Sequence, residues 1–434
     1  MSDSVHLWIV NQYAIKANQA GGTRHHTFAH YMKDAGIETT IIAADSRHDG
    51  DDLEATKVAR PLRVENLGDA RFLWLRKKSY NGNGVGRVIS MLNFSMKVVY
   101  RCWSPERNDV PRPDVIIGSS PHLFAALAGW ILAKRHRVPF VLEVRDLWPK
   151  SLESLLGLNR HHPLIMLMGA IEIFLYRRSS LIIGLLPGMS VHVSLRAGAS
   201  AADVVWIPNG VDLHSHPDAA PIRDSHDFTL IYTGAHGVPN SLHTVLDAAR
   251  LLQESGERTP HGGSFRFEFF GEGICKSDLM AYARLHDLRH VTFHAAVPKS
   301  EVFGILSKAD GLLLPGLSTT LYEYGISPNK LFDYFAVGRP VLFGLSLPHN
   351  PVSEASAGLT VLPESPKALM ETIKTLSRMS LSDRQIMGEN GRAFVEQNHD
   401  SKRLAARYAT SVLSVIDDRA ARALRPNTVP HAHQ

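Results

Sequence analysis

The feature that most restricts the fold is a regular alternation of short apolar runs with amphipathic helical segments. In the first half of the 434 residues, apolar strands are expected at 5–10, 38–43, 114–117, 140–144, 181–185 and 204–207, with helices at 24–35 and 122–135. Alternation of this kind builds parallel strand–helix–strand units, with helices covering both faces of a sheet. The first half is therefore predicted to form a Rossmann-like α/β domain.

The same alternation starts again after a polar stretch at 212–227, which contains two prolines and indicates a linker. In the second half, strands are expected at 229–232, 266–270, 291–295, 311–314 and 340–344, and helices at 241–254, 275–286, 299–308 and 328–336. We therefore predict two Rossmann-like domains, 1–212 and 213–395. Ligands of open α/β sheets bind at the carboxyl ends of the strands, so the two domains are expected to turn their loops into a shared cleft.

The C-terminal part of the chain is predicted to be helical. A long helix is expected at 382–416, with a break near His399 and Asp400. Residues 421–434 are expected to form a disordered tail.

The charge balance argues against nucleic acid as a partner. Lys and Arg number 47 against 42 Asp and Glu, a net charge of +5. The basic residues are spread along the chain, whereas a nucleic-acid binder usually gathers them in one patch. A mild positive excess suits an anionic small ligand and an anionic membrane surface equally well.

Cysteine usage and the apolar runs indicate a reducing, cytoplasmic location. Cys102 and Cys275 are the two cysteines, and they have neither metal-site spacing nor a disulfide framework. The N-terminus lacks a basic segment followed by an apolar one, so no signal peptide is expected. The longest apolar stretch, 163–176, contains Glu172 and is too short to span a bilayer.

A glycine pair follows the first expected strand. Gly21 and Gly22 precede a helix, so an anion could approach both the backbone and the N–H groups of the helix N-terminus. The pair does not form the GxGxxG pattern of nicotinamide-cofactor sites, and a plain tight turn is the alternative. His25 and His26 diverge by roughly 100° on a helix. They therefore cannot bind one metal together, and we expect both to be structural.

Two loops of the second half have a similar character. Gly234 and His236 follow its first strand, and Glu272, between two glycines, follows the next. Glycine again allows close backbone approach to a ligand. Glu272 could accept hydrogen bonds from a ribose or a base, and an exposed turn carboxylate is the alternative.

Residues 143–149, Glu-Val-Arg-Asp-Leu-Trp-Pro, place charged side chains at the end of an apolar strand. Asp146 could orient or deprotonate an acceptor hydroxyl. Arg145 could hold a phosphate or a carboxylate in bidentate fashion. The alternative is an Arg–Asp ion pair that fixes the loop.

The most informative segment is Ser-Pro-Asn-Lys-Leu-Phe-Asp-Tyr-Phe-Ala-Val-Gly-Arg-Pro, at 327–340. Ser327 is expected to cap a helix that begins at the following proline. Asn329 and Lys330 then lie in the first turn, where unpaired N–H groups and the positive end of the helix dipole favour an anion such as a diphosphate. Asp333 lies on the same face as Lys330, and it could bond a ribose hydroxyl or hold Lys330. A capped surface helix with an i,i+3 ion pair is the alternative.

The chain resembles glycosyltransferase family 4, of GT-B architecture, in the branch of bacterial L-fucosaminyl (N-acetylfucosamine) transferases of polysaccharide assembly. The resemblance is carried by GGTRHH, VLEVRDLWP, IPNGVDL, FFGEG and SPNKLFDYFAVGRPV, in this order, and it extends over nearly the whole chain. It implies a nucleotide-sugar donor in the C-terminal domain, an acceptor at the N-terminal domain and transfer with retention. It also implies that a final helix, 396–420, crosses back to pack on the N-terminal domain.

Three positions depart from the family pattern. The family has two glutamates eight residues apart at this segment; the position of the second is Asp333 here, and that of the first is Gly325. The usual basic pair after the first strand of the C-terminal domain is missing, so Lys330 is expected to take over the charge of the pyrophosphate. Arg145 occupies the place of a histidine. The pKa of an arginine side chain is about 12 or more, so the side chain stays protonated and cannot act as a base. Asp146 is therefore left as the candidate base.

We therefore predict a retaining glycosyltransferase that moves a sugar of N-acetylhexosamine type from UDP to a saccharide acceptor. Lys330, Asn329 and backbone N–H groups would stabilise the departing diphosphate, so no divalent metal is expected. The acidic segment 49–52 lies in a polar loop and is interpreted as a solvated turn. A UDP-sugar 2-epimerase of the same architecture and a non-catalytic subunit that binds UDP are the alternatives.

The resemblance points to a lipid-linked acceptor at the cytoplasmic face of the inner membrane. Two segments mix basic with apolar side chains, 71–101 and 164–178. Such segments can lie at an anionic membrane surface, and core helices with solvated basic faces are the alternative. The protein is thus expected in the cytoplasm, either soluble or peripheral at the membrane.

Overall fold

The computed structural model describes residues 4–16, 23–45, 62–76, 85–151, 153, 157–215, 221–222 and 225–424. They form two compact units. The first contains the described parts of Met1–Lys16, Thr23–Pro208 and Leu404–Gln434, and the second contains those of Asn209–Arg403. Two predicted features lie outside the described residues, namely the glycine pair Gly21 and Gly22 and the acidic segment 49–52.

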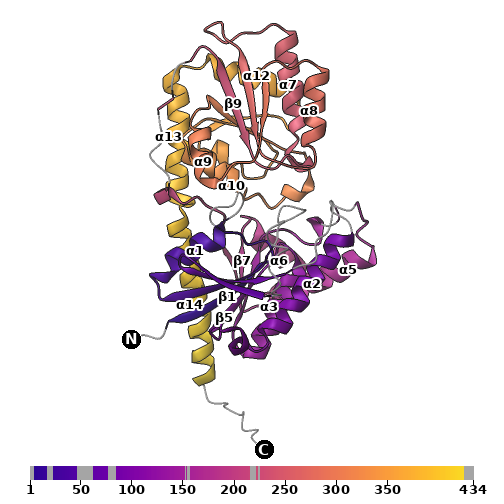
Figure 1. Ribbon diagram of the computed structural model, residues 1–434, viewed down its shortest axis with the longest axis vertical. Coiled ribbons are helices and arrows are strands. Elements are labelled where there is room, and N and C mark those ends of the chain that lie inside the picture. The colour runs from indigo at the N-terminus through magenta and orange to yellow at the C-terminus, as the bar shows by residue number, and fades with distance from the viewer. Residues whose placement is uncertain are drawn as a thin grey trace, which may run out of the picture. The chain divides into compact units, whose positions relative to one another are not determined.

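Within the described residues, the first unit is built on an eight-stranded sheet with the order β3-β4-β2-β1-β5-β6-β7-β8. Strands β1, β5 and β7 of this sheet are labelled in Figure 1. All neighbouring strands are parallel except β3 and β4. Their bounds are Val5–Val10 (β1), Ile37–Ala44 (β2), Leu62–Leu67 (β3), Ala70–Leu75 (β4), Val115–Ser119 (β5), Phe140–Val144 (β6), Leu181–Gly184 (β7) and Val204–Trp206 (β8). Since β1 lies between β2 and β5, the loops after β1 and β5 flank a topological switch point.

The antiparallel ribbon of β3 and β4 was not predicted. Phe72 and Trp74 of β4 are buried and stack on each other, with ring centroids 4.7 Å apart. The interpretation of 71–101 as one basic-apolar surface segment is therefore wrong at its start, where the chain is a core strand.

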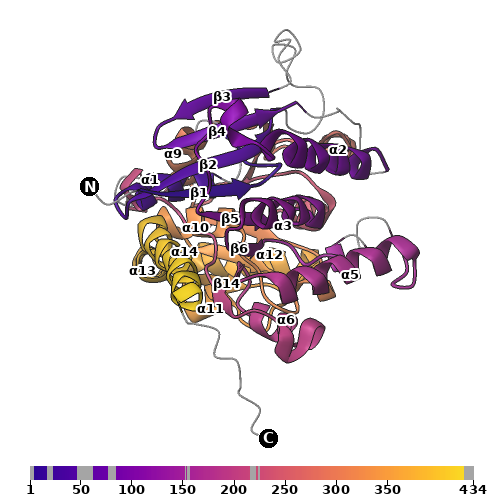
Figure 2. The ribbon, with the colours of Figure 1, turned by 90° about the horizontal axis from the view of Figure 1, so that it is seen from below.

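Helices cover both faces of this sheet. In Figure 2, α2 (Val85–Cys102), α3 (Leu123–His136) and α5 (Pro163–Arg178) lie along one side, and α1 (Arg24–Lys33) and α14 (Ser401–Leu424) lie along the other. The short helix α6 (Met189–Ala197) precedes β8. None of the helices in the described part of the chain is both long and apolar enough to cross a membrane.

The predicted break in the last long helix is confirmed. Helix α13 (Leu381–Asn398) ends before His399, and α14 begins after Asp400. From Leu404 onward the chain belongs to the first unit, where the Tyr408 ring packs edge-on against Phe28 of α1 at 5.4 Å. Helix α14 extends to Leu424, so the expected start of the tail at 421 is too early.

The second unit is a parallel sheet of six strands in the described residues, with the order β11-β10-β9-β12-β13-β14. Its strands are Phe228–Thr233 (β9), Phe265–Phe270 (β10), Val291–His294 (β11), Gly311–Pro315 (β12), Val341–Gly344 (β13) and Gly358–Thr360 (β14). Its helices are Leu242–Glu254 (α7), Lys276–Leu285 (α8), Lys299–Leu306 (α9), Asn329–Ala336 (α10), Pro351–Glu354 (α11), Pro366–Arg378 (α12) and α13. The elements β14, α11 and α12 were not predicted. The switch point of this sheet lies between β9 and β12.

Candidate functional site

Helix α10 begins at the carboxyl edge of the second sheet. Its first residue is Asn329, and the residue before it, Pro328, offers no side-chain cap. The predicted cap by Ser327 is wrong, because the Ser327 hydroxyl instead accepts a hydrogen bond from the backbone N–H of Asn209 at 2.8 Å. The Asn209 amide also donates to the Ser327 carbonyl at 2.7 Å. Asn329 and Lys330 occupy the first turn as predicted, and no side chain caps this turn.

Lys330 extends from α10 toward the end of β9. Its ammonium donates to the Tyr232 hydroxyl at 2.8 Å and to the Asn240 side-chain carbonyl at 2.7 Å, and it lies 4.5 Å from the centroid of the Tyr232 ring. No carboxylate of the described residues pairs with it. Burial consequently lowers the pKa of Lys330 to about 7, because nothing nearby compensates the charge.

Asp333 takes a different partner from the one predicted. Its carboxylate accepts from Lys299 of α9 at 2.5 Å, and the i,i+3 ion pair with Lys330 is not formed. The alternative of a surface helix with an internal ion pair is thereby wrong. Asp333 ties α10 to α9, while the Lys330 ammonium is left facing polar but uncharged groups.

The glycines after β9 and β10 allow these loops to pack against each other. Gly234 adopts φ +142, and a Cβ there would lie 3.1 Å from the Lys330 ammonium. Gly271 adopts φ +148, and a Cβ there would lie 1.9 Å from the Gly234 carbonyl oxygen. Both the backbone conformation and the close contact therefore require glycine. The backbone is thus brought beside the ammonium without an intervening side chain.

His236 is buried in the same loop with unsatisfied nitrogens. Its side chain is 0% exposed, and neither ring nitrogen has a hydrogen-bond partner among the described residues. Burial, helped by the positive charges of Lys276 and Lys330, lowers the pKa of His236 to about 4. The ring is therefore neutral near pH 7 and offers one N–H donor and one acceptor.

Glu272 is exposed and forms an ion pair with Lys276, which was not predicted to belong to the site. The Lys276 ammonium donates to Glu272 at 2.8 Å and to the backbone carbonyls of Gly271 and His294. That hydrogen bond is the main favourable cause of the lowered pKa of Glu272, against the opposing effect of burial. The only sequence signal was the i,i+4 spacing of the pair. Lys276 supplies positive charge near the loop that lacks the family's basic pair.

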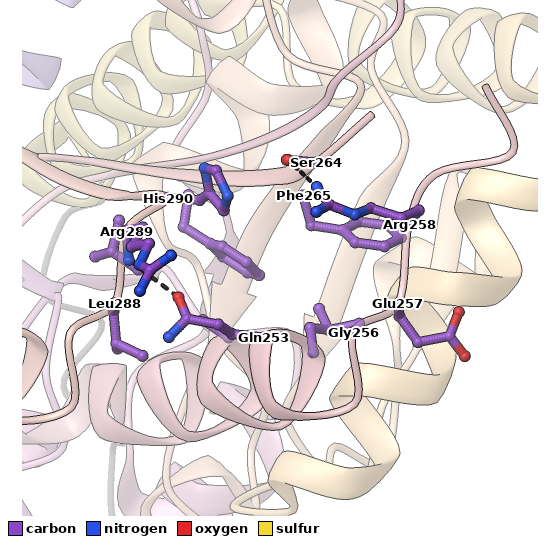
Figure 3. A pocket seen from close by; sticks show the side chains of 13 residues that line it. Gln253, Gly256, Glu257, Arg258, Ser264, Phe265, Leu288, Arg289 and His290 are labelled. Carbon is purple, nitrogen blue, oxygen red and sulfur yellow. Dashed lines mark hydrogen bonds between the residues drawn. The ribbon is translucent and has the colours of Figure 1, made fainter. Parts of the chain in front are cut away.

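A cavity of about 190 Å³ lies elsewhere in the second unit (Figure 3). It is lined by residues at the start of β10 and β11, the opposite sheet edge from Lys330. Within it, the Arg258 guanidinium donates to the Ser264 hydroxyl, and the Arg289 backbone N–H donates to the Gln253 side-chain carbonyl. We do not assign it to substrate.

In the first unit, the residues after β6 lie at the carboxyl edge of its sheet. The Arg145 backbone N–H donates to the Ser120 hydroxyl at 3.4 Å. Asp146 is exposed, and among the described residues it forms no ion pair with Arg145, so the predicted alternative of a pair that fixes the loop is wrong. Desolvation by the surrounding protein raises the pKa of Asp146, and the positive charges of Arg145 and Arg87 oppose that rise.

A buried ionic cluster beneath this edge was not foreseen. Glu143, 0% exposed, accepts hydrogen bonds from Arg24 at 3.0 Å, His25 at 2.7 Å and Ser119 at 2.6 Å. Arg24 and His25 counteract the cost of burial, and the pKa of Glu143 lies well below its usual value. The prediction that His25 is structural is confirmed. The cluster joins α1, β5 and β6, and the hydroxyl of Tyr408 reaches it from α14 at 3.5 Å.

The switch point of the first sheet carries a second polar pair. His122 caps α3 by accepting the Ala125 N–H at its Nδ1, so its Nε2 bears the hydrogen that is donated to the Gln12 side-chain carbonyl at 2.7 Å. Burial lowers the pKa of His122 to about 3, and the charge of Arg87 adds to this. The Gln12 amide nitrogen is buried with no hydrogen-bond partner in the described residues. It is a fixed donor next to the edge that carries Asp146.

Comparisons with known proteins agree with this architecture. Residues 20–210 match the family described as glycosyl transferase 4-like domain, and residues 227–379 match glycosyl transferases group 1. The glycogen synthase of Mycobacterium tuberculosis (strain CDC 1551 / Oshkosh) is 28% identical over 147 residues. This match spans 34% of the chain and 34% of that relative, about a third of its length.

Two solved structures are similar over almost the full length. Sucrose-phosphate synthase from Thermosynechococcus elongatus has a TM-score of 0.73 at 14% identity, covering 95% of this chain and 100% of the other. Anabaena HepE in complex with UDP and glucose has a TM-score of 0.63 at 13% identity, covering 94% and 100%. These similarities confirm the GT-B fold, and together with the two family matches they show that the chain is a glycosyltransferase of the GT-B superfamily.

Proposed function

We propose that this glycosyltransferase moves a sugar of N-acetylhexosamine type from UDP to a lipid-linked saccharide, with retention at the anomeric carbon. The observation that carries the donor part is the Lys330 ammonium at the start of α10, whose partners among the described residues are all uncharged. A diphosphate would supply the missing negative charge. The complex of HepE with UDP and glucose supports UDP as the nucleotide.

The proposed role of the carboxyl edge of the second sheet follows from the charge that develops on the diphosphate during transfer. When the bond between the anomeric carbon and the β-phosphate oxygen breaks, negative charge grows on the diphosphate. The Lys330 ammonium and the backbone N–H groups of Asn329 and Lys330 would stabilise that charge. Preorganised donors of this kind supply a large part of enzymatic rate enhancement, and for this reason the proposed mechanism needs no divalent metal.

The remaining donor contacts are proposed from burial and polarity. Gly234 brings backbone close to the diphosphate, and Gly21 and Gly22 keep the role predicted for them. One nitrogen of the buried His236 ring would form a hydrogen bond with an oxygen of the nucleotide-sugar. Glu272 and Asp333 would accept hydrogen bonds from the ribose or base, and Ser327 would contribute backbone groups.

The acceptor is proposed to bind at the carboxyl edge of the first sheet. Asp146 would accept a hydrogen bond from the attacking hydroxyl, and Arg145 would hold an acceptor phosphate. The raised pKa of Asp146 means that the carboxylate loses its charge at a higher pH than usual, so the rate should fall as the pH drops through that value. We place the enzyme in cell-surface polysaccharide assembly, in the cytoplasm and peripheral at the inner membrane, as in the fucosaminyltransferase-like branch.

One assay tests the proposal. The protein is incubated with a panel of UDP-sugars, each with a lipid-linked or a water-soluble saccharide acceptor, and UDP release and product mass are followed with and without EDTA. We expect acceptor-dependent UDP release that EDTA does not abolish. Conversion of one UDP-sugar into another without acceptor would instead identify an epimerase. Binding of UDP without turnover would identify a non-catalytic subunit.

The variant Asp146→Asn tests the proposed acceptor edge of the first sheet separately from the proposed donor edge of the second sheet. We expect it to lower the rate of UDP release by roughly 10²–10⁴-fold and to leave the Kd for UDP unchanged, because the substitution lies in the first unit. Asp203→Asn, elsewhere in that unit, serves as the matched control. An Asp146→Asn enzyme with wild-type turnover would remove this residue from the proposal.

A further inference from the structure

Helix α2 exposes an apolar face that the described part of the chain does not cover. Its inner side is core, with Met91, Phe94 and Val98 buried. Its outer side is also apolar, with exposed fractions of 47% for Ile89, 39% for Leu92, 64% for Met96, 76% for Tyr100 and 44% for Trp103 just beyond its end. These positions recur every three or four residues, so they form one stripe along the helix.

The stripe opens into a groove between α2 and α3. The groove has a volume of about 610 Å³. Its walls are mainly apolar and include Leu92, Met96 and Val99 from α2 and Phe124, Leu127 and Ile131 from α3. Large contiguous apolar patches are uncommon on the surfaces of soluble monomers and mark contact sites.

The charged side chains of α2 and α3 themselves all have one sign. Helices α2 and α3 contain 18 and 14 residues, and neither contains an acidic side chain. Their charged residues are Arg87, Lys97, Arg101, Lys134 and Arg135. Aromatic rings sit beside these cations, with the Arg101 guanidinium 5.4 Å from the Tyr100 ring and that of Arg135 5.3 Å from the Trp103 ring.

An exposed apolar face on two helices whose charged residues are all cations complements an anionic bilayer. Apolar and aromatic groups insert among the lipid chains near the headgroups, and Lys and Arg remain at the anionic phosphates. A protein partner of equal apolarity would not require the uniform positive charge. The charge pattern therefore favours lipid over protein as the occupant.

The stripe leads to the proposed acceptor edge. Arg87 lies in the first turn of α2, and its charge acts on both His122 and Asp146. The N-terminal end of α2 is thus near that edge, and the stripe begins there at Ile89 and runs to Trp103.

We propose that the α2–α3 face docks the protein on the surface of an anionic lipid bilayer. The occupant is the bilayer itself, with its acyl chains against the groove and its anionic headgroups against the basic residues. The proposal rests on the proposed function in one respect, since a docked α2 would present Asp146 to a lipid-linked acceptor. Docking itself requires no turnover, so it can be tested separately.

The test is flotation of the full-length protein with vesicles of phosphatidylglycerol and phosphatidylcholine, or of phosphatidylcholine alone. We expect binding to the anionic vesicles at low salt, weaker binding at high salt and little binding to the neutral vesicles. The variant Met96→Asp/Tyr100→Asp should reduce the bound fraction by roughly tenfold or more. Lys134→Glu/Arg135→Glu should weaken binding to the anionic vesicles alone.

The matched control is Leu285→Asp on α8, which changes a residue 81% exposed in the second unit. It should bind vesicles like wild type. Because the substituted side chains are exposed, thermal unfolding should be unchanged in all of these variants. Absence of binding to anionic vesicles at low salt overturns the proposal, and so does binding that Met96→Asp/Tyr100→Asp leaves intact.

Self-association is the competing outcome. If the wild type sediments as a dimer, Met96→Asp/Tyr100→Asp makes it monomeric, and neither protein floats, the face is an interface between two copies and the proposal is overturned.

UDP release with a water-soluble acceptor separates this inference from the proposed function. The α2 variant should retain that activity, and its absence in the wild type would count against the transferase assignment and leave the flotation result standing.

Discussion

Lys330 donates a hydrogen bond to the hydroxyl of Tyr232 at 2.8 Å, although Asp333 lies three residues further along the same helix. The carboxylate of Asp333 is taken by Lys299 instead. An ammonium with uncharged partners is destabilised by burial, and its pKa falls to about 7. We propose that a diphosphate binds beside this ammonium, and the first two predictions test that role.

Replacement of Lys330 by alanine should reduce turnover far more than stability. Loss of one preorganised donor at a developing negative charge costs roughly 10²–10³-fold in kcat, whereas removal of a buried cation with no counter-ion should leave Tm close to that of the wild type. Steady-state UDP release and thermal unfolding measure the two effects. Lys367→Ala, at an exposed site on α12, is the control. Turnover near the wild-type rate would show that Lys330 does not contact the donor.

UDP binding at pH 8 should take up a proton. In the unliganded protein Lys330 is mostly neutral at this pH, because its pKa is about 7. A diphosphate beside it favours the ammonium and raises the pKa, so about one proton is bound per UDP, and the affinity falls as the pH rises above 7. Isothermal titration calorimetry in two buffers of different ionisation enthalpy gives the number of protons. A buffer-independent enthalpy at pH 8 would contradict the prediction, and Lys330→Ala should show that behaviour.

Gly234→Ala should damage both the fold and donor binding. The residue has φ +142, and the new methyl group would lie 3.1 Å from the Lys330 ammonium. A strained backbone of this kind costs about 1–3 kcal/mol, and the displaced ammonium should weaken the affinity for UDP. Denaturant unfolding and UDP titration measure the two effects.

The control for this substitution is Gly304→Ala in α9. A Cβ at Gly304 would meet no atom within 4 Å, and alanine in a helix interior stabilises by about 0.5–1 kcal/mol. The two substitutions should therefore shift stability in opposite directions. Equal effects would show that the Gly234 conformation is not required.

Glu143→Gln should be strongly destabilising. It leaves the Arg24 guanidinium buried without a counter-charge, and loss of one partner of a buried ion pair costs about 3–5 kcal/mol. The free energy of unfolding from denaturant titration tests this, with Glu38→Gln, at a side chain that is 55% exposed, as control. A loss below about 1 kcal/mol would mean that the cluster contributes no more than a surface pair.

Much of the fold could be predicted because its signals are local. Strand β6 has the predicted bounds of 140–144, and α10 begins within one residue of the expected position. Apolar periodicity and glycine or proline at the ends define such elements within a few residues. The β3–β4 ribbon escaped prediction because its burial depends on pairing with β2, which the segment itself does not encode.

The position of the candidate site in the fold could be predicted, but the contacts of its side chains could not. Lys330 was expected at a helix start on a strand edge, and it lies there. The Ser327 cap failed because Asn209, distant in sequence, takes that hydroxyl. Lys276 and Glu143 were missed for a similar reason, since Lys276 also bonds the carbonyl of His294 on β11, and Glu143 is held by Arg24 and His25 of α1.

The sequence by itself determined two successive α/β units, a helix break at His399 and Asp400, and a lysine at the start of α10. The tertiary structure decided which groups those residues meet. Sheet order brings the end of β9 next to the start of α10, so Lys330 meets Tyr232, 98 residues earlier in the chain. Helix spacing alone would have paired Lys330 with Asp333, but a closer cation from α9 took that carboxylate. Charge pairing depends on distances across the fold, and only the folded chain fixes those distances.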